Sequence, residues 1–152
     1  MPVNYIKKYI SSEELEAIKN HIAEIEKYTS GEIRLCFLKS RAWIDRKLTP
    51  RELALNEFHK LGMQNTKDKT GVLLFILFSE KKFEVVADEG INNKIPQDKW
   101  DVITNHLVMH FKEGRFKDGI IKALEEIKEV LMGEFPRLSD DTDELSNDIV
   151  IK

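Results

Sequence analysis

The chain has 152 residues, with 24 basic and 27 acidic side chains and a formal net charge of −3. This length suits one domain with a sizeable core, and the absence of an overall positive charge argues against nucleic-acid binding by bulk electrostatics. The single cysteine, Cys36, excludes an intramolecular disulfide and a cysteine-based zinc cluster. The sequence has no hydrophobic signal segment and no run long enough for a transmembrane helix, so we expect a cytoplasmic protein without membrane insertion. We also expect it to be a monomer.

The N-terminal segment is predicted to be an arm followed by a helix. Residues 1–10 are expected to be extended. Ser11 and Glu14 then have the spacing of a capping box, which marks a helix start. Apolar residues recur at spacings of three and four over 15–25, which places one apolar stripe on this helix. We expect the helix to end near residue 28.

A strand and a second helix are predicted next. Residues 32–38 alternate between polar and apolar in their first half and become apolar on both faces afterwards, as in a strand that is more covered at its end. Residues 39–47 form a loop. Thr49 then caps a helix that has Glu52 at its third position, and Gly62 is a suitable residue just beyond its end.

The run 71–78 is the most apolar stretch of the chain and is apolar on both faces. It is too short to cross a membrane, so we predict a central strand that is covered on both sides. A charged turn at 79–82 leads into a third strand over 83–87. Residues 88–95 are expected to form a loop.

Two further helices and an acidic tail complete the chain. A third helix is predicted to open at Pro96 and close at Gly114, and a fourth to run from about 116 to 132. Residues 137–152 are rich in acidic side chains and are predicted to be a C-terminal tail. The composition of this tail is typical of a solvated terminus. We expect the folded domain to cover residues 11–136, and the sequence leaves open whether the tail docks on it.

The order of these elements predicts an α/β fold. A strand–helix–strand unit makes the first two strands parallel with a right-handed crossover, and the hairpin makes the third strand antiparallel to the second. The result is a small mixed β-sheet, a parallel β-α-β unit plus an antiparallel hairpin strand, sandwiched between helices.

This topology gathers acidic residues at one edge of the sheet. The two parallel strands start there and the third strand ends there, so Asp88 and Glu89 should approach Asp68 and Glu32, with Asp98 folding back over the edge. Crowded carboxylates repel one another, and a hard cation with oxygen ligands, Ca²⁺ or Mg²⁺, would relieve that repulsion. The alternative is a set of solvated loop acids that pair with nearby lysines.

The sequence resembles the TPM-domain family over about residues 11–136. The motifs that carry the resemblance are Thr29-x-Gly31-Glu32-Ile33-Arg34, Gly71-Val72-Leu73-Leu74, Asp88-x-Gly90-Ile91, Phe111-Lys112-x-Gly114 and the acidic Asp140-Asp141-Thr142-Asp143-Glu144-Leu145. The last of these is similar to a short soluble bacterial branch of the family.

The resemblance implies a TPM-like α/β/α architecture, divalent-ion binding with calcium in some members, and acid phosphatase activity as in a plant member. It implies Asp88, Glu89 and Asp98 as ion ligands, with Asp68 and Glu32 as further candidates. Arg115 stands where many members have Asp, which counts against transferring the phosphatase activity.

Three functions therefore remain open at this point. The first is a regulatory or interaction module that binds a divalent cation, with Ca²⁺ favoured over Mg²⁺. The second is a metal-dependent acid phosphatase, for which Arg34 or Arg41 would have to clamp phosphate, although Arg41 is expected at the opposite end of the sheet. The third is a partner-binding protein that uses the Trp43 loop or the acidic tail.

Overall fold

A mixed sheet lies at the centre of the fold. Within residues 2–139 and 143–152, which the computed structural model describes, the sheet has four strands in the order β3-β2-β1-β4. β1 (Glu32–Leu38) pairs in parallel with β2 (Gly71–Leu77), and β2 pairs antiparallel with β3 (Lys82–Ala87). The predicted parallel unit with an antiparallel hairpin strand is confirmed.

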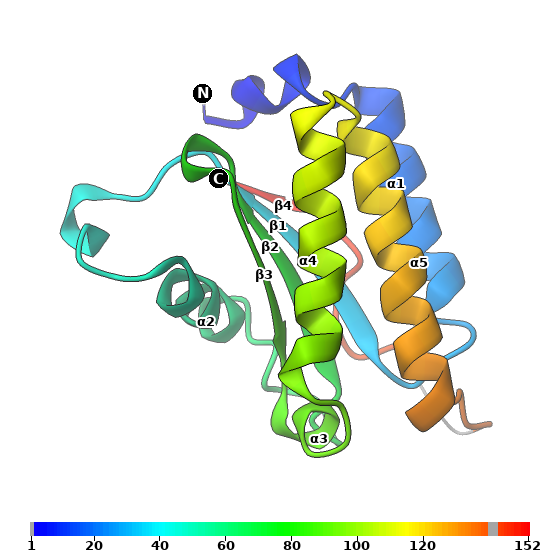
Figure 1. The fold of residues 1–152 in the computed structure, drawn as a ribbon. Helices are drawn as coiled ribbons and strands as arrows, with labels where there is room; N and C mark the ends of the chain where they lie inside the picture. Colours follow the sequence, from blue (N-terminus) through cyan, green and yellow to red (C-terminus); the bar gives the residue numbers. More distant parts are fainter. Residues whose placement is uncertain (1, 140–142) are drawn as a thin grey trace.

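Helices cover both faces of the sheet (Figure 1). α1 (Ser12–Ile25), α4 (Gln97–Lys112) and α5 (Phe116–Glu134) lie on one face, and α2 (Pro50–Lys60) lies on the other. Because alternate side chains of β2 pack into the two cores, all seven residues of this strand are buried. The central strand is therefore covered on both sides, as predicted.

Both predicted capping boxes are present. The Ser11 side chain accepts a hydrogen bond from the Glu14 backbone N–H, and the pair Thr49 and Glu52 does the same at the start of α2. Gly62 follows α2 with a φ of 69°, the left-handed conformation that glycine adopts without steric cost. The predicted loop at 88–95 instead contains the short helix α3 (Glu89–Asn92).

The prediction of an extended N-terminal arm is wrong. Pro2–Lys8 form a 3₁₀-helix, η1, that packs on the core. Tyr5 and Ile6 in η1, and Ile10 just after it, are buried in the core. Burial of these side chains outweighs the low helical tendency of so short a segment.

The C-terminal tail docks on the domain, which settles the question that the sequence left open. β4 (Val150–Ile151) adds to the free edge of β1 in parallel, and the Lys152 backbone N–H donates to the Phe37 carbonyl at 2.8 Å. The ammonium of Lys152 lies 2.9 Å from the buried carboxylate of Glu57. Asp140, Asp141 and Thr142 lie outside the described residues. The division of the chain into an arm, a domain and a tail stays a prediction.

No helix of the described residues combines the length and the apolar character that crossing a membrane would require.

Candidate functional site at the acidic edge of the sheet

The backbone segments that carry Glu32, Asp68 and Asp88 meet at one edge of the sheet, as predicted, whereas the approach of Asp98 to this edge stays a prediction. Glu32 at the start of β1 is in register with Gly71 at the start of β2, and the Asp88 N–H donates to the Gly71 carbonyl at 2.8 Å. A Cβ on Gly90 would lie 2.2 Å from the Asp68 carbonyl oxygen, so α3 packs directly against the segment before β2. Glu32, Asp68 and Asp88 thus come from adjoining segments.

The side chains of the predicted ion ligands have different environments. Asp88 caps α3, because its Oδ1 accepts from the Glu89 N–H at 2.8 Å, and its buried Oδ2 has no hydrogen-bond partner among the described residues. Asp68, Glu89 and Asp98 are exposed. Within the described part of the chain, no group of three or more His, Cys, Asp or Glu side chains is arranged to hold a metal. Their role as ligands stays a prediction.

The carboxylate of Glu32 forms hydrogen bonds with the C-terminal tail. Its side chain is only 2% exposed, and Oε1 accepts hydrogen bonds from the backbone N–H groups of Glu144 and Leu145, the latter at 2.9 Å. The Glu144 carboxylate in turn accepts from the Lys67 N–H at 3.1 Å. Burial raises the pKa of Glu32, and the negative charges of Glu144 and Asp143 act in the same direction, whereas the two tail hydrogen bonds oppose them.

Glu26, at the end of α1, is a second buried carboxyl at this edge. It is 2% exposed; Oε2 accepts from the Ile33 N–H at 2.7 Å, and Oε1 has no partner among the described residues. Burial raises the pKa of Glu26 to about 8, and the nearby charges of Asp143 and Glu32 add to that effect. The carboxyl of Glu26 is therefore largely protonated at neutral pH.

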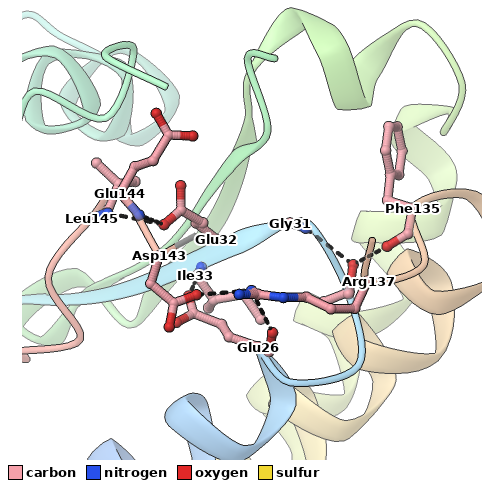
Figure 2. Close-up of polar contacts among 10 residues, drawn as sticks. Glu26, Gly31, Glu32, Ile33, Phe135, Arg137, Asp143, Glu144 and Leu145 are labelled. Carbon is pink, nitrogen blue, oxygen red and sulfur yellow. Dashed lines mark hydrogen bonds and ion pairs between the residues drawn. The ribbon is translucent and has the colours of Figure 1, made fainter. Parts of the chain in front are cut away.

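Arg137 joins these segments (Figure 2). Its Nη1 donates to the Glu26 backbone carbonyl at 3.0 Å and to Asp143 Oδ1 at 2.9 Å. We call the cluster of Glu26, Glu32, Arg137, Asp143 and Glu144 the acidic edge. It brings four acidic side chains and one guanidinium together from α1, β1 and the tail.

The Thr29-x-Gly31-Glu32 motif positions Glu32. Thr29 Oγ1 donates to the Phe135 carbonyl at 2.5 Å and accepts from the Gly31 N–H at 3.1 Å. A Cβ on Gly31 would lie 2.9 Å from a methyl carbon of Leu131 in α5. The missing side chain at Gly31 therefore lets the start of β1 lie against the end of α5. This contact helps to position Glu32 at the start of β1.

Sequence reasoning missed Glu26, Arg137 and the contribution of the tail. One signal for Glu26 was available: it follows Ile18 and Ile22 at spacings of eight and four, so it continues the apolar stripe of α1 and should face inward. Nothing local marks the contact of Arg137 with Glu26, because these two residues are 111 positions apart.

The arginines considered for phosphate binding have other partners. Arg41 forms a bidentate ion pair with Glu80, with N–O distances of 2.6 and 2.8 Å, and also donates to the Leu48 carbonyl. These contacts lie near the opposite end of the sheet from the acidic edge. Arg34 reaches the Asp148 carbonyl at 3.4 Å, beside β4. Neither guanidinium contacts the acidic side chains of the edge in these bonds.

Comparison with known proteins identifies the protein family to which this chain belongs. The family profile of the TPM domain matches residues 3–130, and the chain belongs to this family. The NMR structure of BA42 protein from the psychrophilic bacterium Bizionia argentinensis is 37% identical, covers 95% of this chain and 97% of its own, and superposes with a TM-score of 0.81.

A more distant structure shares the fold. The N-terminal domain of a protein from P. gingivalis, solved by NMR, is 18% identical, with a TM-score of 0.68 and coverage of 84% of this chain and 79% of that one. A comparison with curated proteins returned no match.

Proposed function

We propose that this TPM domain is a regulatory or interaction module that binds a divalent cation at the acidic edge, with Ca²⁺ favoured over Mg²⁺. The observation that carries the proposal is the crowding of Glu26, Glu32, Asp143 and Glu144, in which the Arg137 guanidinium donates to Asp143 and the pKa of both buried carboxyls is raised. A hard cation would stabilise the charged forms of these groups, and oxygen-rich, adaptable ligand sets suit Ca²⁺ better than the strict octahedral geometry of Mg²⁺.

Glu32 is the proposed central ligand, because it belongs to both sets of acids. The sequence predicts Asp88, Glu89, Asp98 and Asp68 as its companions, and the tail acids Asp143 and Glu144 act on it electrostatically. Asp88 supports this assignment with a buried oxygen that lacks a partner among the described residues. The exposed carboxylates of Asp68, Glu89 and Asp98 are free to rotate toward an ion.

The proposed regulatory output is the docking of the tail. Asp143 and Glu144 bring negative charge next to Glu32, and this repulsion opposes the hydrogen bonds that hold the tail in place. A cation at the edge removes the repulsion and leaves the hydrogen bonds, so ion binding and tail docking should favour each other. The ion would therefore act on the surface that the module presents to a partner.

An NMR titration tests this proposal. Adding CaCl₂ or MgCl₂ to ¹⁵N-labelled protein should shift the amide signals of Ile33, Glu144 and Leu145 in a saturable way. Glu32→Gln should weaken binding at least tenfold, whereas Glu16→Gln, which changes an exposed acid on α1, should leave it unchanged. Unchanged amide signals at millimolar Ca²⁺ would overturn the proposal.

Two further variants separate the two sets of acids. If the sequence-predicted ligands complete the site, Asp88→Asn and Asp98→Asn will weaken Ca²⁺ binding, and the amide of Glu89 will shift along with those of the tail. If the tail supplies the ligands, both variants will bind Ca²⁺ as the wild type does. Either result identifies the ligands that accompany Glu32.

Partner binding through the Trp43 loop is a second candidate, and one observation favours it. Trp43 and Ile44 are 76% and 82% exposed, and the guanidinium of Arg46 lies 3.7 Å from the centre of the Trp43 ring. Exposed aromatic side chains with a neighbouring arginine are typical of the energetic centres of protein interfaces. A purified binding partner should lose affinity for Trp43→Ala and keep it for Arg51→Ala, and equal affinity for both variants would exclude this loop.

A further inference from the structure

A cavity of about 440 Å³ opens at the opposite end of the molecule from the acidic edge. It lies where β2 ends, between η1, the β2–β3 turn and the junction of α4 and α5, at the end of Figure 1 that holds the N-terminus. Its volume falls in the range of about 300–1,000 Å³ that is typical of small-molecule sites. The residues that line it are Tyr9, Ile76, Leu77, Phe78, Lys81, Phe83, Val108, Phe111, Lys112 and Phe116.

Aromatic rings that contact one another form the wall of this cavity. Phe111 packs edge-to-face on Phe83 and Phe116, with ring centroids 4.8 and 5.0 Å apart, and Tyr9 packs on Phe78 and Phe116 at 4.6 and 5.1 Å. Such contacts hold the rings in fixed orientations, so the wall is formed before any ligand arrives. Tyr9, Phe111 and Phe116 are only partly buried, which leaves apolar ring surface available at the cavity.

The charged residues of the cavity are both cations. Lys81 and Lys112 line it and are exposed, no acidic residue is among its described lining residues, and neither lysine forms an ion pair with any residue that the structure describes. Lys81 also has a φ of 53°, a left-handed conformation that a residue with a side chain adopts at a cost. Glycine would remove that cost but also the positive charge.

We propose that this cavity binds a medium-chain fatty carboxylate. The acyl chain would lie against the rings of Phe78, Phe111 and Phe116, and the carboxylate would sit between the ammonium groups of Lys81 and Lys112. The apolar wall selects an aliphatic body, and the two lysines, in a lining that contains no acidic residue, select an anionic head group. The site shares no residue with the acidic edge and is independent of cation binding there.

Titration of ¹⁵N-labelled protein with octanoate, in the presence of a chelator, tests the proposal. Amide signals of Phe78, Lys81, Phe111 and Lys112 should shift together in a saturable way. Hexanoate should bind more weakly, by about fourfold for each methylene group removed. Octylammonium, which has the same chain and the opposite charge, should bind at least tenfold more weakly than octanoate.

Variants of the lysines separate ligand binding from folding. Lys81→Gly relieves the positive φ and should fold at least as well as the wild type, yet weaken octanoate binding about two- to fivefold. Lys112→Gln should have a similar effect, whereas Lys99→Gln, at the other end of α4, should have none. Val108→Trp, which fills the cavity, should abolish binding, with its folding checked from the dispersion of the amide signals.

Three outcomes would overturn the proposal. The first is equal affinity for octanoate and octylammonium, and the second is the absence of saturable shifts at millimolar octanoate. The third is binding to anionic lipid vesicles without binding of dissolved octanoate, which would assign this end of the molecule to a membrane surface instead.

Discussion

The buried carboxyl of Glu26 makes the stability of the domain depend on pH in a direction that can be tested. Its pKa rises from an ordinary 4.5 to about 8 on folding, mainly because the group leaves water. Below pH 4.5 the carboxyl is protonated in both the folded and the unfolded chain, so it contributes no pH dependence. Between these two pKa values the unfolded chain loses the proton and the folded chain keeps it, so the free energy of unfolding falls as the pH rises.

The size of this effect follows from the shift in pKa. A difference of one pKa unit corresponds to about 1.4 kcal/mol, so stability should fall by about 1.4 kcal/mol per pH unit and by about 5 kcal/mol in all between pH 4.5 and 8. Relaxation of the folded protein around the charged form would reduce the total. The raised pKa of Glu32 acts in the same direction and adds to the slope.

Urea denaturation of Glu26→Gln at a series of pH values isolates the contribution of Glu26. The amide oxygen of glutamine still accepts the hydrogen bond from the Ile33 N–H, but the side chain has no proton to lose. The variant should match the wild type within about 1 kcal/mol at pH 5 and exceed it by several kcal/mol at pH 8.5. Glu16→Gln, with an exposed side chain, should follow the wild type throughout. Parallel pH curves for wild type and Glu26→Gln would refute the reasoning.

Three further predictions concern the edge, the helix packing and the tail. Binding of Ca²⁺ at pH 7 should release protons from the acidic edge, because the cation favours the ionised carboxylates. Calorimetry in two buffers of different ionisation enthalpy measures this release, and equal apparent binding enthalpies in the two buffers would contradict it. Gly90→Ala should destabilise the domain by at least about 2 kcal/mol in urea denaturation, since its Cβ would lie 2.2 Å from the Asp68 carbonyl oxygen. Gly133→Ala, in open space within α5, should instead stabilise it by up to about 1 kcal/mol, so the same sign for both would exclude steric contact as the cause. Lys152→Met should cost about 1–3 kcal/mol, because it leaves the buried Glu57 carboxylate without its ion pair, and unchanged stability in the same assay would show that the tail contact contributes nothing.

Features of the fold that depend on local chemistry could be predicted from the sequence. The two capping boxes at Ser11 and Thr49 fix where α1 and α2 begin, because the side chain and the backbone donors that it satisfies lie within three residues. The run 71–78 indicates a doubly covered strand, because only a position between two layers tolerates apolar side chains on both faces. Topology then places Asp68 and Asp88 at one edge.

Features that depend on distant contacts could not be predicted in this way. β4 has two residues, too few for a periodic pattern, and it forms because β1 offers an unpaired edge. The 3₁₀-helix at Pro2–Lys8 similarly forms where the core accepts Tyr5 and Ile6. The environment of Glu26 requires Arg137 and Asp143, which approach it only after the tail has folded back.

The same contacts imply that protons and cations act on the acidic edge in the same direction. Asp143 and Glu144 raise the pKa of Glu32, so the charged tail and the charged Glu32 repel each other, while two backbone N–H groups of the tail still donate to that carboxylate. Adding a proton to Glu26 and placing a cation beside Glu32 both lower the negative charge at this edge. The docked tail is therefore expected to need a cation most at alkaline pH, where Glu26 has lost its proton, and least at mildly acidic pH.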